Sequence, residues 1–370
     1  MKPHDPLLKR PAIDVAVALA GDDLNRWVKA RKRLKEQDPD GIHDFRVALR
    51  RLRSTLRAFR PELKAAVPRR TRRRLRRLAR AAGTSRNLQV GREWLISQLE
   101  TLSPSEQTGA QWLVARVAAR EQDAEKMLAR RITKDFPRLK RKLRGAFHHE
   151  GPSADRSGPS KSASVVFRDT LRQWTRELEG RLRAIRTVAD WDDAHAARIG
   201  IKRIRYLLKP FKKEIANAAA ALEQLSALQD VLGSLQDARV LAGELRSALA
   251  ESAAEVAQRA CDELLPWSST DDSTPEPAPP ADQAGLIALA RRIGVDYETT
   301  FTRLRREWLE ERAAVLLFLL HELGHGRKSR PRHARRAVRP RLALHRSAGT
   351  APLHQVHRRP VPKGATRPAK

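Results

Sequence analysis

Two sets of a histidine followed by cations are the residues of this sequence best suited to chemistry. Each cation of the second set lies 152 residues after its counterpart in the first. Guanidinium and ammonium groups bind phosphate and carboxylate oxygens, and imidazole adds a hydrogen bond or, below about pH 6.5, a further charge. The pattern therefore indicates an anion-binding unit that is present twice. The two sets are His43, Arg46, Arg50, Arg51, Arg53 and Arg57, and His195, Arg198, Lys202, Arg203, Arg205 and Lys209.

The spacing of these residues predicts two amphipathic helices. At 3.6 residues per turn the histidine and four of the cations of each set share one face. The opposite face is apolar, with Phe45, Leu49, Leu52, Leu56 and Phe59 in the first segment and Ile201, Ile204, Leu208 and Phe211 in the second. Like charges at these spacings repel each other by a few tenths of a kcal/mol per pair, so an isolated helix gains nothing from the stripe. An anionic partner explains it.

The overall composition agrees with an anionic partner. The chain has 370 residues, with 75 Lys and Arg against 43 Asp and Glu, and a net charge of +32. Residues 326–370 contain 14 of the cations and no acid, so 61 cations and all 43 acids remain in residues 1–325. A field of this size favours polyanions such as nucleic acid, an acidic membrane surface or a phosphate polymer.

Several features predict a cytoplasmic protein. The single cysteine, Cys261, excludes an intramolecular disulfide framework. The longest apolar run, Ala313–Leu320, is too short to cross a membrane, so we expect no membrane insertion. Lys9 and Arg10 precede an apolar stretch that Asp14 interrupts, which is a poor signal peptide.

Helical periodicity recurs along the chain and strand signals are scarce, which predicts an all-α fold. We expect helices over about residues 11–36, from a turn at 38–41 to 59, and over 69–82, 88–101, 106–134 and 165–188. Another begins at 192, and helices continue to about 323. The predicted division is a first repeat at 8–150, a linker at 151–164, a second repeat at 165–323 with a flexible Pro-rich loop at 266–282, and a disordered basic tail at 326–370.

A second internal match supports a duplication. Gly83-Thr-Ser-Arg-Asn-Leu-Gln-Val90 aligns with Gly233-Ser-Leu-Gln-Asp-Ala-Arg-Val240, 150 residues later. Two landmarks at nearly the same offset predict two helical bundles related by a pseudo-twofold axis. Between the landmarks of the first repeat, residues 69–80 contain eight arginines in twelve residues, which we interpret as either a second polyanion contact or general surface charge.

At this point the chain resembles the CHAD family, the histidine-bearing α-helical domains that bind inorganic polyphosphate. The matching segments are His43–Arg53, His195–Tyr206 and Leu228–Gly233 with Gln236 and Asp237, and the resemblance extends over about residues 8–323. It implies two antiparallel four-helix bundles with a basic groove or pore between them. It also implies that the motif cations bind polyphosphate, with His43 and His195 beside them. The family usually has Arg-Asp-x-Asp where this chain has Arg86-Asn-Leu-Gln89, which implies a more positive site.

The sequence His321-Glu-Leu-Gly-His325 has the H-E-x-x-H form that binds zinc in metalloproteases. Pro331 stands where a third histidine ligand would be expected, and no acid follows Glu322. Gly324 and Gly326 instead indicate the end of a helix. We therefore predict a helix terminus and no metal site, with His321 and His325 as weak candidate ligands. A metal-binding or zincin-like protease function through His321, Glu322 and His325 is the less favoured alternative.

The sequence thus predicts non-catalytic binding of inorganic polyphosphate by the two stripes, with no cofactor, and with association with polyphosphate granules as one outcome. No phosphate-binding glycine loop and no evident acid cluster for Mg²⁺ occur, so an enzyme is disfavoured. The alternative is a nucleic-acid-binding protein. The basic tail would be enough for contact with RNA or DNA, whatever the folded core binds. Aromatic residues are only 5% of the chain and do not alternate with the stripes, so base-stacking surfaces are not visible.

Overall fold

The computed structural model describes residues 6–36, 38, 41–147, 161–264 and 283–326. Within these ranges the chain is helical, with one isolated antiparallel bridge between Pro11 and Ser162 and no β-strand. The predicted all-α class is therefore confirmed. None of the helices within these ranges is both long and apolar enough to cross a membrane.

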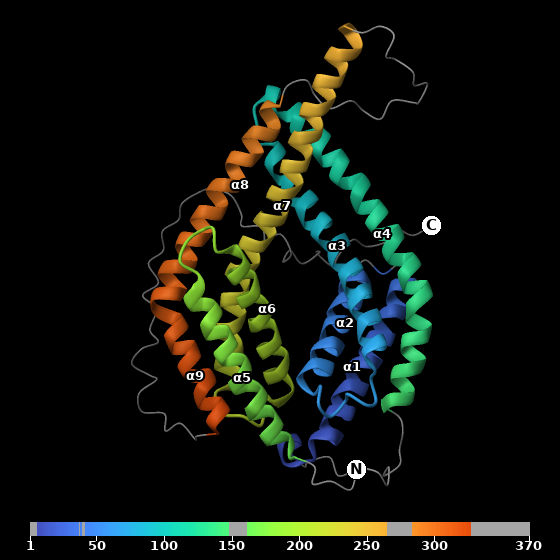
Figure 1. The fold of residues 1–370 in the computed structure, drawn as a ribbon, viewed down its shortest axis with the longest axis vertical. Coiled ribbons are helices and arrows are strands. Elements are labelled where there is room, and N and C mark those ends of the chain that lie inside the picture. Colours follow the sequence, from blue (N-terminus) through green and yellow to red (C-terminus); the bar gives the residue numbers. More distant parts are fainter. Residues whose placement is uncertain (1–5, 37, 39–40, 148–160, 265–282, 327–370) are drawn as a thin grey trace, which may run out of the picture.

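The first half of the chain forms four helices, α1 (Ala12–Lys35), α2 (Gly41–Ala58), α3 (Arg69–Leu99) and α4 (Pro104–Phe147), after a short 3-10 turn, η1 (Leu7–Lys9). The second half forms α5 (Ala163–Ala184), α6 (Trp191–Leu208), the turn η2 (Lys209–Phe211) and α7 (Ala218–Leu264). It ends with α8 (Ala284–Arg303), a π-helical segment η3 (Leu304–Arg312) and α9 (Ala313–His325). Figure 1 shows the halves side by side, joined at both ends of the molecule.

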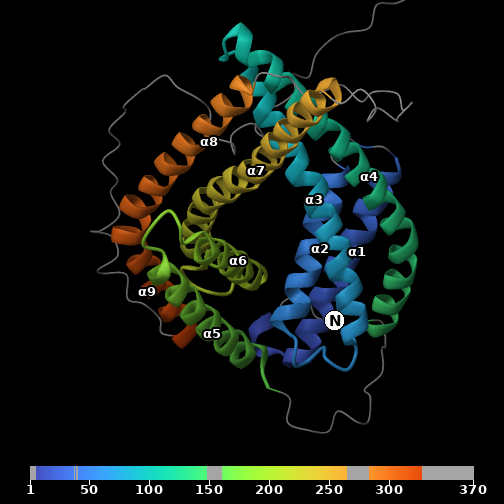
Figure 2. The same cartoon turned by 45° about the horizontal axis from the view of Figure 1, so that its top comes forward.

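The helices pack on one another within each half, and other pairs of helices join the two halves. In the first half α2 and α4 each pack on α1 and on α3, and in the second half α6 packs on α5 and α7 while α9 packs on α5 and α7. Between the halves, α2 contacts α6, and the far ends of α3 and α4 pack on α7 and α8 (Figure 2). A separate apolar cluster joins these far ends, with Leu95, Leu113, Leu241 and Leu289 at its centre.

The amphipathic prediction for the two motif helices is correct. All nine apolar residues predicted to face the core of α2 and α6, and the turns that follow them, are buried. Phe45 lies against Trp27, with ring centroids 5.6 Å apart, and Phe211 lies against Phe167 at 5.2 Å. Because burial holds this face inward, the cations of each helix must point away from the core of their own half.

Several predicted helix boundaries are wrong, including the end of the helix expected at 165–188, which stops at Ala184. Residues 69–82 and 88–101 form one continuous helix, α3, that passes through Gly83, although glycine costs about 1 kcal/mol inside a helix. The predicted helix at 106–134 extends to Phe147 through Pro137. In both places buried side chains on each side of the interruption, such as Phe136 and Leu139 in α4, hold the helix against its neighbours. Tertiary packing outweighs the local preference.

Close helix crossings and one helix end depend on glycine. A Cβ atom on Gly285 of α8 would collide with the backbone carbonyl of Glu106 in α4, so this glycine permits the close approach of the two helices. Gly326 has a φ of 70°, in the left-handed region, and ends α9. Most of the predicted linker, the Pro-rich loop and all but the first residue of the predicted tail lie outside the described residues, as do Pro39 and Asp40 of the predicted turn.

Candidate anion-binding site

The stripes of α2 and α6 face each other where the two helices make contact. Arg46 and Arg50 of α2 and Arg198 and Lys202 of α6 are half-buried and form a central group. Burial lowers the pKa of Lys202 to about 7, with Arg198 and Arg50 as the next causes. Burial, followed by Arg50 and Arg86, lowers the pKa of Arg46 to about 9. The fold therefore holds like charges together in a partly desolvated place, and an anion there would relieve their repulsion.

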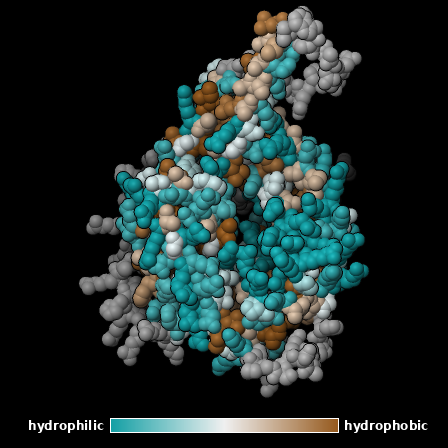
Figure 3. Space-filling view, in the orientation of Figure 1, coloured by the Kyte–Doolittle hydropathy of each residue, from teal (hydrophilic) through white to brown (hydrophobic). Residues whose placement is uncertain are grey.

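A wide cleft opens on one side of this central group, and we call it the motif cleft. Its volume is about 850 Å³, and 11 of the 16 residues that line it are arginine or lysine. None of the lining residues is acidic. The hollow between the hydrophilic surfaces over α2, α3 and α6 is visible in Figure 3. The 11 cations are Arg50, Arg53, Arg57, Arg60, Lys64, Arg69, Arg72, Arg73, Arg76, Lys202 and Arg203.

Several guanidinium groups at the site lack partners for buried donors. The Nε atoms of Arg50, Arg198 and Arg203 are buried and have no hydrogen-bond partner in the described part of the chain. An unpaired buried donor costs about 1–3 kcal/mol, more if charged. Donors of this kind beside a cleft lined with cations fit phosphate or carboxylate oxygens as the missing acceptors.

The structure does not place all twelve predicted site residues in one cleft. Arg46 and Arg198 of the central group lie outside the lining of the motif cleft. Arg51, Arg205 and Lys209 do not line it either, and these three form a second group that we call the rear group. Arg51 pairs with Asp23 at 3.3 Å, and Arg205 donates a hydrogen bond to Gln229 Oε1 at 2.7 Å. Burial, followed by Arg51 and Arg205, lowers the pKa of Lys209. Part of this group is thus already paired within the protein.

The two histidines lie in different surroundings. His43 is exposed beside the central group, and partial burial, then Arg46 and Arg86, lower its pKa. His195 donates a hydrogen bond through Nδ1 to Gln236 Oε1 of α7. It lies with Trp191, Arg239 and Tyr297 around a small space beside α7, and it does not line the motif cleft. His43 therefore lies beside the central cations and His195 is hydrogen-bonded to α7, and neither histidine lines the motif cleft.

Some residues of the site were not predicted. Arg60 and Lys64 line the motif cleft from the segment after α2, where no periodic pattern marks them. Arg69, Arg72, Arg73 and Arg76 line it from α3, and the arginine-rich run at 69–80 was their signal in the sequence. Asp237 also affects the site. Its negative charge raises the pKa of Arg198 and Lys202 and so opposes part of the lowering that burial causes.

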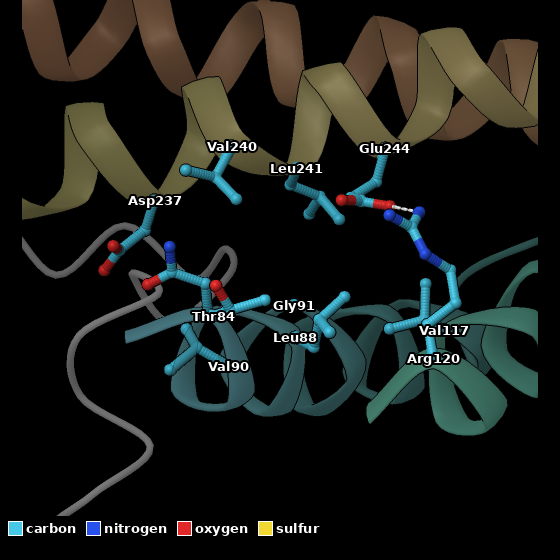
Figure 4. Close-up of a pocket in the computed structure, with 11 residues that line it drawn as sticks. Thr84, Leu88, Val90, Gly91, Val117, Arg120, Asp237, Val240, Leu241 and Glu244 are labelled. Carbon is cyan, nitrogen blue, oxygen red and sulfur yellow. Dashed lines mark hydrogen bonds and ion pairs between the residues drawn. The ribbon is translucent and has the colours of Figure 1, made fainter. Parts of the chain in front are cut away.

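The crossing of α3 and α7 contains a smaller pocket of about 120 Å³ (Figure 4). Leu88, Val117, Val240 and Leu241 give it apolar walls, and an ion pair between Arg120 and Glu244 lies at one end. Its apolar walls do not suit a polyanion. Asp237 lines the other end of the pocket, as the figure shows.

The two histidines of the H-E-x-x-H sequence do not converge on one point. His321 Nε2 lies 3.3 Å from Glu179 Oε2, and His325 Nδ1 donates to the carbonyl oxygen of His321 at 2.7 Å. Within the residues that the structure describes, no group of three or more His, Cys, Asp or Glu side chains could hold a metal ion. The sequence lies at the C-terminus of α9.

Comparisons with known proteins agree with this fold. The chain is similar to a crystal structure of the CHAD domain from the plant Ricinus communis, with 22% identity over 86% of this chain and 95% of that one and a TM-score of 0.55. It is also similar to PptA from Streptomyces chartreusis, with 14% identity over 80% of this chain and 100% of that one and a TM-score of 0.57. No curated protein is significantly similar to it in sequence. The model of the CHAD domain family matches residues 18–246, more than half of the sequence, and the chain therefore belongs to the CHAD family.

Proposed function

We propose that this protein binds inorganic polyphosphate in the motif cleft and does not hydrolyse it. The observation that carries the proposal is a cleft lined by 11 cations and no acid, beside guanidinium donors that are buried without partners. The CHAD family is associated with polyphosphate, and this chain belongs to it. Polyphosphate has a charged oxygen on every unit, so closely spaced arginine forks can bind it along its length.

The lining of the cleft favours polyphosphate over nucleic acid. Tyr206 is its single aromatic residue, whereas proteins that bind single strands stack successive bases on aromatic side chains. The lining also has no carboxylate with which to hold a divalent cation, as most phosphoryl-transfer sites do. We therefore expect a bound polymer to stay intact. Recruitment to polyphosphate granules would follow from binding alone.

The test is a competition at physiological salt between long-chain polyphosphate and RNA or DNA for the full chain. We expect polyphosphate to displace nucleic acid, and affinity to fall steeply as salt rises. Changing Arg46, Arg50, Arg198 and Lys202 together to Ala should abolish specific binding while circular dichroism shows the helices intact. Nucleic acid that outcompetes polyphosphate would contradict the proposal.

A matched control removes as much charge elsewhere. Lys134, Arg138, Arg141 and Arg144 are exposed on α4, which lines no part of the motif cleft. Their combined change to Ala should leave most of the affinity, because general attraction falls equally in the two variants. Equal loss in both variants would show that the net charge, including the tail, accounts for binding.

A further inference from the structure

The arginine-rich start of α3 is only partly accounted for by the motif cleft. Of its eight arginines, Arg69, Arg72, Arg73 and Arg76 line the cleft. Within the part of the chain that the structure describes, none of the eight forms an ion pair with an acidic side chain. Arginines elsewhere on long helices do pair, such as Arg92 with Glu121 at 2.6 Å. The run is therefore a block of positive charge with no paired acid among the described residues.

A second space adjoins the motif cleft across this helix. It has a volume of about 500 Å³ and is lined only by arginines of α3. Three of these arginines, Arg70, Arg74 and Arg77, line this second space and not the motif cleft, and we call them the outer arginines. Arg69 and Arg73 line both spaces, so the cationic surface continues from the cleft to the outer side of α3 without a break.

The arrangement on the helix explains this continuity. Thr71, Leu75 and Leu78 are buried and fix one face of α3 against the core. The arginines occupy the rest of the circumference, because residues 69, 73 and 76 share a face and residues 70, 74 and 77 follow about 100° further round. From Arg69 to Arg77 the surface extends about 12 Å along the helix axis.

A ligand that uses both spaces must be long and flexible. A small anion binds entirely within the cleft and makes no contact with the outer arginines. A linear polymer whose end leaves the cleft over Arg69 and Arg73 meets three more cations at once. A rigid duplex cannot bend closely around a single helix, whose diameter is only about 10–12 Å.

We propose that the outer arginines Arg70, Arg74 and Arg77 are an exit track for a linear polyanion, which makes the affinity depend on chain length. The inference rests on the proposed function and deepens it, because it assigns the cleft to any polyphosphate and the outer arginines to long chains only. The protein would then retain long polymers in preference to short ones.

The experiment compares tripolyphosphate with long-chain polyphosphate on the full chain and on the triple variant R70Q/R74Q/R77Q. Glutamine is a good helix former, and all three side chains are solvent-accessible, so the variant should fold. We expect its affinity for long chains to fall roughly tenfold and the slope of log affinity against log salt to decrease by about 2, while tripolyphosphate affinity changes little.

The control variant is R138Q/R141Q/R144Q, which removes three exposed arginines from α4. Equal losses for long chains in the two variants would overturn the exit track and leave only general attraction. An equal loss for tripolyphosphate in the α3 variant would also overturn it, because the outer arginines would then act within the cleft. Failure of the unchanged protein to bind either polymer would instead reject the proposed function, and the two failures are thus distinguishable.

Discussion

The starts of α3 and α7 occupy corresponding positions in the two halves but carry opposite charge. Residues 69–80 of α3 include eight arginines, whereas residues 219–230 of α7 include no Lys or Arg and two acids, Glu223 and Asp230. Both helices nevertheless bury a leucine pair at the same positions, Leu75 and Leu78 in α3 and Leu225 and Leu228 in α7. The fold therefore requires the leucines and tolerates either charge pattern, so the arginines serve something other than folding.

The same asymmetry continues on the motif helices. Arg203 of α6 lies with Arg57 and Arg76 at the motif cleft, and its counterpart Arg51 lies with Lys209 in the rear group. The rear group faces Gln229 and Asp23, whereas the motif cleft is lined mainly by arginines, of which Arg203 pairs with Glu177 at 3.6 Å. The two motif helices thus carry cations on both sides, with more of them on the side of the motif cleft. We expect the ligand to use mainly that side.

The most direct test of this difference between the two sides is to remove three cations from each side in turn. We expect R53Q/R57Q/R76Q, in the motif cleft, to weaken polyphosphate binding roughly a hundredfold, since three contacts of about 1 kcal/mol each are lost. The variant R51Q/R205Q/K209Q should weaken it only a few-fold. Isothermal titration at fixed salt would measure both. Similar losses on the two sides would show that the polymer uses both faces equally.

A carboxylate that acts on cations of both halves offers a second test. Asp237 of α7 acts on Arg86, Arg198 and Lys202, whereas its counterpart in α3 is the uncharged Asn87. We expect Asp237→Asn to tighten polyphosphate binding a few-fold, because an internal competitor for the cations is removed, and to lower the Tm. Asn87→Asp should do the reverse to binding. Unchanged affinity in both variants would mean that the ligand never reaches the central group.

The motif helices were predictable because one periodicity fixes both their faces. Once Phe45 and Leu52 are assigned to the core, Arg46 and Arg53 must face outward, and the structure agrees. The division of the cations was not predictable. Whether Arg51 or Arg53 lines the motif cleft depends on how α2 is rotated against α6, and that rotation is set by contacts between the halves.

Contributions from outside the periodic segments were also beyond prediction. Arg60 and Lys64 reach the cleft because the chain after α2 folds back, with Leu63 and Val67 buried beneath it. The continuity of α3 through Gly83 was missed since a single glycine is a weak local signal against the packing of a long helix. That continuity carries α3 from the cleft to the far-end crossing with α7.

Lys202 should show opposite effects on binding and on stability. Its pKa is lowered from 10.5 to about 7 in the folded protein, so the unfolded chain binds more protons between these values. The resulting destabilisation is full below pH 7 and disappears as the pH rises to 10.5. Lys202→Met should therefore raise the Tm by several degrees at pH 7 and have no effect near pH 10.5, which calorimetry across this range would measure.

Binding by the same side chain should depend on pH in the other sense. A bound polyanion favours the charged amine, so proton uptake accompanies binding and affinity decreases as the pH rises above 7. Lys202→Arg should keep the affinity and flatten this decrease, because arginine stays charged. A decrease that persists unaltered in the arginine variant would assign the titration to another group.

The smallest effects should come from the histidines that begin each motif. His43 has a pKa below its usual 6.5, so it is neutral at pH 7, and His43→Asn should change affinity there by less than about twofold. Only under more acidic conditions should the variant lose the extra affinity of an imidazolium beside Arg46. His195→Asn should instead lower the Tm, since it removes the hydrogen bond to Gln236, and leave binding unchanged. Matched pH titrations of the two variants would therefore separate one histidine that faces the ligand from one that holds α6 to α7, although both occupy the same position in the sequence motif.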